Sequence, residues 1–140
     1  QCRRRPSNFR FIERHNFKRT RMMTKDEVLE IAKDHEIGAH SFSHESMGFE
    51  NDDFFREDVA KCREYFEEKL AIPLSVYAFP NGSHKEEQFA VLREMGIEHI
   101  LLVGEDYARA KTDVFPRFTI YGSSKIETRF QALGFNRKKI

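Results

Sequence analysis

The stretch "LSVYAFPNGSHKEEQFAVLREMGIEHILLV", residues 74–103, predicts a strand, a turn, a helix and a second strand in that order. Its two apolar runs, 74–79 and 98–103, have the length of strands, and Pro-Asn-Gly after the first run is a turn signal. Between the runs, apolar residues recur every three residues until Gly96, which is typical of a helix that ends at a glycine. A strand–helix–strand unit of this kind favours a parallel sheet.

The same alternation continues on both sides of this unit. Residues 36–40 and 117–121 predict two further strands from their short apolar runs. Capping residues followed by apolar residues at three- and four-residue steps predict the helices. These helices are expected at 24–34, 52–70, 85–95 and 124–134. The whole chain, residues 1–140, therefore predicts a single α/β domain with mostly parallel strands, and functional groups are expected at the carboxyl ends of those strands.

Composition excludes some classes of partner. With 39% hydrophobic and 34% charged residues the chain is typical of a globular protein, and its net charge of +1 gives no overall attraction to nucleic acid or to a membrane. No apolar run is long enough to span a bilayer, and no segment resembles a signal peptide. Cys2 and Cys62 form no metal-type pair, and they favour a cytoplasmic location only weakly.

The first 21 residues are strongly basic. Residues 1–21 hold eight Lys and Arg side chains, and Glu13 is the only acid among them. This segment is either an arm that binds anions or nucleic acid, or a solvated stretch, and the second alternative is the simpler. Salt-sensitive binding to DNA or heparin would distinguish them.

A pair of histidines follows the strand predicted at 36–40. His40 and His44 are four residues apart, which is about 13 Å along a strand but only ~6 Å on a helical turn. Zn–N bonds are ~2.1 Å long, so the two rings can share a metal only if the chain turns through 41–43. Serines favour such a turn. Spacing alone leaves open whether the two are metal ligands or solvated loop residues.

Four stretches resemble the polysaccharide deacetylases, carbohydrate esterase family 4, whose domain is called the NodB homology domain. "EIGAHSFSHESM", 36–47, is similar to the family's motif of His, Ser or Thr, two residues and His. "TKDEVLEIAKDH", 24–35, is similar to the helix before that motif, and "VYAFPNGS", 76–83, to the next motif. "VFPRFTIYG", 114–122, resembles a late Pro-Arg strand of one subgroup.

The resemblance implies a distorted (β/α) barrel with one divalent metal, usually Zn²⁺, and the hydrolysis of N- or O-acetyl groups of a polysaccharide or amino sugar. By position, His40 and His44 match the two metal-binding histidines. Asn81 lies where a backbone N–H helps to hold the oxyanion, and Arg117 could brace the catalytic base. The wall of the carbohydrate-binding site would be formed by Phe79, Pro80 and Gly82.

The chain also departs from the family pattern. The family's Asp-Asp pair, which supplies the base and a metal ligand, does not occur before His40. Asp52 and Asp53 begin a predicted helix, so they are interpreted as capping charges. The late histidine that acts as general acid is also missing, because His99 is the last histidine and lies in a predicted strand. Ala78 stands where many members carry an arginine.

These departures shape the prediction of function. We expect the first strands of the barrel to be missing from residues 1–140, and the open sheet edge to pair with another copy of the chain. Zn²⁺ is expected to bind weakly or not at all with two ligands. The complete protein is predicted to be a metal-dependent carbohydrate deacetylase, a hydrolase of carbon–nitrogen bonds other than peptide bonds. The alternative is an inactive remnant that binds carbohydrate or serves in assembly.

Overall fold

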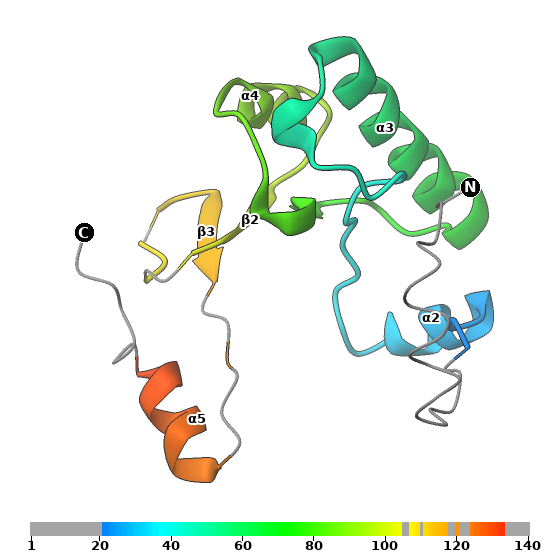
Figure 1. The fold of residues 1–140 in the computed structure, drawn as a ribbon. Helices are drawn as coiled ribbons and strands as arrows, with labels where there is room; N and C mark the ends of the chain where they lie inside the picture. The colour runs from blue at the N-terminus through cyan, green and yellow to red at the C-terminus, as the bar shows by residue number, and fades with distance from the viewer. Residues whose placement is uncertain (1–20, 105–106, 110, 118–119, 121–123, 134–140) are drawn as a thin grey trace, which may run out of the picture. The chain divides into compact units, whose positions relative to one another are not determined.

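The computed structural model describes residues 21–104, 107–109, 111–117, 120 and 124–133 (Figure 1). The basic segment lies almost wholly outside these residues, so its role stays a prediction. The chain divides into two compact units between Lys33 and Asp34. The division does not decide whether 1–140 is a single domain, which stays a prediction.

The first unit contains helix α2, Lys25–Ile31. The capping box predicted for this helix is present: Thr24 Oγ1 accepts the N–H of Glu27 at 3.3 Å, and the Glu27 carboxylate accepts the N–H of Thr24 at 2.8 Å. Arg21 also pairs with Glu27 and, as the largest cause, lowers the pKa of Glu27 to about 2. The helix is shorter than predicted because a turn follows Ile31.

The second unit is built on a parallel sheet. Its strands are β1, Val76–Ala78, β2, His99–Val103, and β3, Val114–Arg117. They lie in the order β1-β2-β3, and both pairings are parallel. The predicted α/β class with mostly parallel strands is therefore confirmed. The strands at 74–79 and 98–103 were placed correctly, although β1 is shorter than its apolar run.

The two outer strands differ from their predicted bounds. Within 36–40 only Ala39 pairs with β1, through its N–H to Val76 O and its carbonyl to the N–H of Ala78, both 2.9 Å. The pairing stops there because Ser41, with φ +63°, leaves the extended conformation at once.

The strand that the structure describes here is β3 at Val114–Arg117, which begins before the predicted strand 117–121 and shares Arg117 with it. Residues 118, 119 and 121 of that prediction lie outside the described residues. The described pairing of β2 with β3 ends at Val103, opposite Arg117. β3 tolerates Pro116 because, among the described residues, it pairs on one side only.

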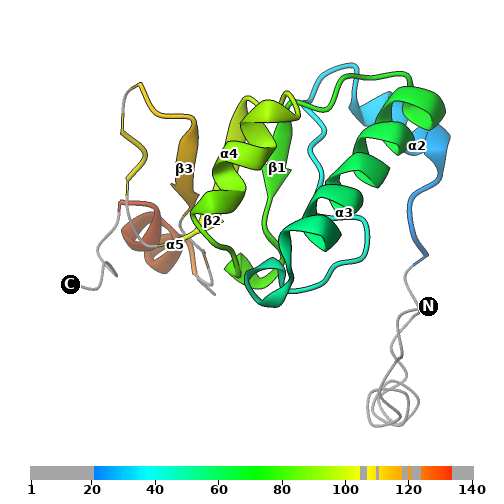
Figure 2. The same cartoon turned by 90° about the horizontal axis from the view of Figure 1, so that it is seen from above.

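Several helices accompany the sheet in the second unit. They are α3, Asp52–Glu64, the π-helix η2, Tyr65–Leu70, α4, Glu87–Glu94, and α5, Lys125–Ala132, with short 3₁₀ turns η1, Met47–Phe49, and η3, Pro80–Gly82. Figure 2 shows α3 and α4 on the same side of β1 and β2. Asn51 Oδ1 caps α3 by accepting the N–H of Phe54 at 2.9 Å, as predicted. Gly96, with φ +84°, ends α4, and Ile97 N–H reaches back to Leu92 O at 2.9 Å.

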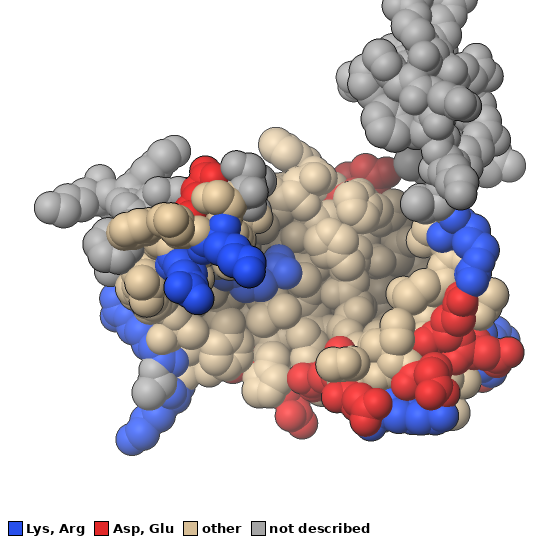
Figure 3. Space-filling model, turned by 90° about the horizontal axis from the view of Figure 1, so that it is seen from below, with Lys and Arg blue, Asp and Glu red and all other residues tan. Residues whose placement is uncertain are grey.

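The core lies between β1 and these helices. Phe55 of α3, Tyr77 of β1 and Phe79 directly after β1 are 0% exposed, and their ring centroids are 5.1 to 6.2 Å apart. Burial of a side chain of this size stabilises the fold by about 2 kcal/mol. Side chains alternate along a strand, so Val76 and Ala78 face the other way. Figure 3 views the molecule from that other side, where an uncharged hollow lies in the middle.

Candidate functional site

The turn after Ala39 brings the two motif histidines together. Ser41 and His44 both adopt positive φ, 63° and 61°, and Ser41 Oγ accepts the N–H of His44 at 2.7 Å. The chain therefore doubles back within four residues. The ring centroids of His40 and His44 are 5.0 Å apart, with an angle of 76° between the ring planes. The turn required for a shared metal is present, while the ligand role itself stays a prediction.

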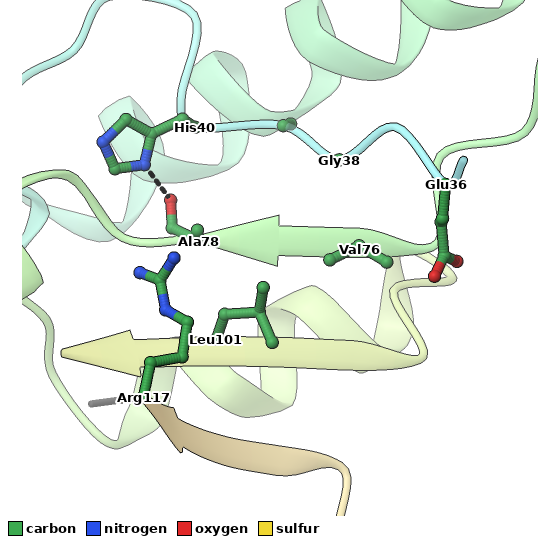
Figure 4. A pocket seen from close by; sticks show the side chains of 8 residues that line it. Glu36, Gly38, His40, Val76, Ala78, Leu101 and Arg117 are labelled. Carbon is green, nitrogen blue, oxygen red and sulfur yellow. Dashed lines mark hydrogen bonds between the residues drawn. The ribbon is translucent and has the colours of Figure 1, made fainter. Parts of the chain in front are cut away.

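The backbone of β1 fixes the orientation of His40. Its Nδ1 lies 2.8 Å from the carbonyl oxygen of Ala78, as Figure 4 shows. A carbonyl can only accept, so Nδ1 carries the proton and Nε2 keeps a free lone pair. A histidine that donates its second N–H to a carbonyl is typical of metal ligands. Ala78 thus contributes to the site through its main chain.

The separation of the two rings matches that of two histidines bound at neighbouring coordination positions of one divalent metal ion. The centroid of an imidazole lies about 3.2 Å from a zinc ion bound to one of its nitrogens, so two rings at a tetrahedral angle are separated by about 5.2 Å. The observed separation is 5.0 Å. No group of three His, Cys, Asp or Glu side chains among the described residues could hold a metal ion. The separation of the two histidines therefore fits a shared metal ion, and the described part of the chain adds no third ligand.

A buried carboxylate holds this turn from behind. Asp58 of α3 is 4% exposed and accepts the N–H groups of Phe42, on Oδ1 at 2.9 Å, and Ser43, on Oδ2 at 2.8 Å. The Ser43 hydroxyl donates to the same Oδ2 at 2.7 Å. Sequence reasoning missed Asp58. The available signal was an acid three residues after Phe55, on the apolar face of the helix.

A pocket of about 440 Å³ opens beside His40, on the side of the sheet away from α3 and α4. It is lined by Glu36, Gly38, Ala39, His40, Val76, Ala78, Leu101 and Arg117. Arg117 Nε donates to Leu102 O at 3.3 Å, and Figure 4 shows its guanidinium extending past Leu101 toward Ala78. Arg117 and His40 therefore line one pocket at the carboxyl end of the sheet. The bracing role of Arg117 stays a prediction.

The Pro-Asn-Gly segment, Pro80–Gly82, which we call the Pro-Asn-Gly wall, follows β1 directly. Asn81 is exposed with φ 57°, its side chain donates to Ser46 Oγ at 3.0 Å, and its N–H has no partner among the described residues. An unpaired N–H is what an oxyanion requires. Phe79 and Pro80 are buried, so they can shape the wall only from beneath. Gly82 lies against Val103 of β2, and a substrate contact by any of the three wall residues stays a prediction.

The remaining candidate residues lie within a helix or a strand. Asp52 and Asp53 are exposed in the first turn of α3, which supports their interpretation as capping charges. His99 begins β2, is half-buried and packs edge-on against Phe115 at 5.5 Å. None of the helices in the described ranges is long and apolar enough to cross a membrane.

Parallel strands with a two-histidine turn and a Pro-Asn-Gly wall at their carboxyl ends define an α/β domain of barrel type with a candidate metal site. The family model described as polysaccharide deacetylase matches residues 7–100, which is more than half of the chain. The chain belongs to the polysaccharide deacetylase family, and members of this family generally use a divalent metal. A search of curated proteins found no match.

One of two similar solved structures supports the fold. The chain resembles the structure of IcaB from Ammonifex degensii with a TM-score of 0.62 at 15% identity, covering 81% of this chain and 53% of that one. It also matches BA3943, a family 4 pseudoenzyme from Bacillus anthracis, with a TM-score of 0.46 at 21% identity, covering 68% and 37%. The chain thus spans about half of the length of IcaB. The prediction of a partial NodB-like barrel is confirmed by the first likeness.

Proposed function

We propose that this chain contributes the histidine side of the active site in a carbohydrate deacetylase that hydrolyses N- or O-acetyl groups. The observation that carries the proposal is the convergence of His40 and His44 to 5.0 Å between ring centroids, at the carboxyl end of a parallel sheet. Membership of the polysaccharide deacetylase family supports the substrate class.

Each residue has a defined part in this proposal. His40 and His44 would hold the divalent metal, with His40 Nε2 free because Nδ1 donates to Ala78 O. A bound metal would supply Lewis acidity, which polarises an acetyl carbonyl and activates water at neutral pH. The exposed N–H of Asn81 would donate to the oxygen that gains charge in the transition state. Arg117 would hold a carboxylate or a substrate oxygen in the pocket.

The test compares acetate release from N-acetylglucosamine oligomers by two proteins. Residues 1–140 alone should release none above background, because an absent base and an absent acid each reduce the rate by about 10²–10⁴. The chain produced together with the coding sequence that precedes residue 1 should release acetate if that sequence supplies an Asp-Asp pair.

In the longer protein, His40→Ala should abolish both Zn²⁺ binding and acetate release. The matched control is His35→Ala, an exposed histidine that lies before the motif, and it should leave both unchanged. A longer protein with an Asp-Asp pair that stays inactive, or that keeps its activity after His40→Ala, would refute the deacetylase proposal.

One observation favours the alternative of an inactive module that binds carbohydrate. No described residue completes a set of three metal ligands. The pocket beside His40 would then bind sugar hydroxyls without any hydrolysis. Calorimetric titration with N-acetylglucosamine oligomers in the presence of a chelator separates the two proposals, since only the inactive module should bind fully without metal.

A further inference from the structure

We propose that Asp58 is a positioning residue that fixes the turn between His40 and His44 in the conformation that brings the two rings together. The proposal rests on the proposed function of these histidines as ligands. It assigns a role to a side chain on α3 that touches neither ring in any described contact but holds two of the three residues between them.

The contacts of Asp58 are concentrated on one turn. Its Oδ1 accepts the N–H of Phe42 at 2.9 Å, and its Oδ2 accepts both the N–H and the hydroxyl of Ser43, at 2.8 and 2.7 Å. Two adjacent N–H groups point at one carboxylate only if the backbone between them takes one particular conformation. The carboxylate therefore selects a single shape for the segment that separates the histidines.

The turn needs such support because its backbone is strained. Ser41 and His44 both have φ near +60°, a region that residues with a Cβ rarely adopt. Such conformations persist only where surrounding interactions determine them. The hydrogen bond from His44 N–H to Ser41 Oγ closes the turn from within, and Asp58 holds it from outside.

All hydrogen bonds that the structure describes for the Asp58 carboxylate come from this turn. The carboxylate is 4% exposed and forms no described ion pair, although an isolated buried charge is costly. Lys61, one helical turn further along α3, pairs instead with Glu57 at 2.6 Å. Hydrogen bonds to a carboxylate are about twice as strong as neutral ones, so the N–H groups of the turn are what balances the charge.

The element that carries Asp58 is itself rigid. Phe55, Val59 and Cys62 on the same face of α3 are buried in the core, and Phe55 contacts Tyr77 of β1. β1 in turn holds His40 through the carbonyl of Ala78. The turn is therefore fixed at its start by β1 and in its middle by α3, and both elements meet in one aromatic core.

The experiment uses the whole 140-residue chain and compares Asp58→Asn with Val59→Ala by NMR. Asp58→Asn keeps the size of the side chain but replaces one acceptor with an NH₂ group, so the N–H groups of Phe42 and Ser43 can no longer each be paired with their own oxygen. Val59→Ala removes buried volume one residue along the same helix and leaves the turn untouched. In the parent chain the rings of His40 and His44 should show mutual nuclear Overhauser effects, and the N–H protons of Phe42 and Ser43 should be shifted downfield.

Asp58→Asn should lose the ring-to-ring effects and the downfield shifts. In the longer protein with an Asp-Asp pair, the same substitution should lower the affinity for Zn²⁺, followed on the imidazole resonances, by about 10- to 100-fold. Val59→Ala should lower thermal stability but keep all three properties. If Asp58→Asn does not fold, Ser43→Ala, which removes one of the three bonds at an exposed residue, should produce the same changes to a smaller degree.

Ring-to-ring effects that persist in Asp58→Asn, that persist unchanged in Ser43→Ala, or that are absent from the parent chain would overturn the proposal. Failure of the proposed function looks different. In that case the parent chain shows the ring contact and loses it in Asp58→Asn, yet neither the chain nor its longer form binds Zn²⁺ or releases acetate.

Discussion

The Pro-Asn-Gly wall depends on glycine at its last position. Gly82 has φ +67°, and a Cβ there would lie 2.9 Å from Cβ of Val103. Gly96, which ends α4, has φ +84° but nothing within 4 Å of an added Cβ. The two glycines therefore separate the effect of backbone conformation from the effect of a steric clash.

Gly82→Ala should be the more damaging of two matched substitutions. Gly96→Ala should reduce the free energy of unfolding by about 1–2 kcal/mol, the cost of the left-handed conformation for a residue with a Cβ. Gly82→Ala should reduce it by about 1–3 kcal/mol more, because the backbone must also move away from β2. Urea unfolding of both variants measures the difference. Equal losses in the free energy of unfolding would show that the backbone at residue 82 moves away from Val103 without an energetic cost.

At the scale of residues, the roles that depend on neighbours in sequence could be predicted, and the roles that depend on distant parts of the chain could not. The capping box at Thr24, the cap at Asn51 and the stop at Gly96 were predicted because each depends only on neighbours in sequence. Asp58 was not, because its burial depends on a turn 15 residues earlier in the chain. Sequence spacing showed that His40 and His44 needed a turn but could not show what holds it.

Among the elements, α3 supports the histidine turn through Asp58. Its buried face includes Cys62, which is 4% exposed. Burial, and to a lesser extent the charge of Asp58, raises the pKa of the Cys62 thiol from 9.0 to about 12. The folded protein therefore binds this proton more tightly than the unfolded chain does. The thiol contributes its full stability below the unfolded pKa and loses it as the pH rises toward the folded pKa.

The chain should therefore lose stability in mild alkali through Cys62. Between pH 8 and pH 10 the thiol should account for a loss of about 1.4 kcal/mol in the free energy of unfolding. Urea titrations at both pH values measure the loss, and Cys62→Ala should show a pH dependence smaller by that amount. The thiol should also react slowly with a disulfide reagent in the folded protein. Equal pH dependence in the two proteins would contradict the assigned cause.

Strand bounds were the least predictable feature of the elements. β1 and β2 followed from apolar runs next to turn signals, and their parallel pairing followed from the helix between them. The start of β3 at Val114 was missed because "FTIYG" has the stronger strand propensity, and most of "FTIYG" lies outside the described residues. The extent of a strand is decided by its neighbour, which composition alone does not reveal.

At the scale of the whole molecule, the sheet edge at 36–40 lacks a partner on its outer side among the described residues. A groove of about 260 Å³ runs beside that edge, between the histidine turn and the end of α3. It is lined in part by Phe42, 58% exposed, and Tyr65, 47% exposed. An uncovered strand edge next to exposed aromatic residues is a surface on which chains associate.

We therefore expect the 140-residue chain to associate through this edge, and Phe42→Lys to prevent the association. A lysine there would place a charge in the groove and leave the hydrogen bond from the backbone N–H of residue 42 to Asp58 intact. Phe49→Lys is the matched control, because Phe49 is 88% exposed but does not line the groove. Light scattering over a concentration series should show assembly in the parent chain and in Phe49→Lys, and a monomer in Phe42→Lys. A parent chain that stays monomeric at the highest concentration, with the edge open to amide hydrogen exchange, would show that this edge is stable without a partner.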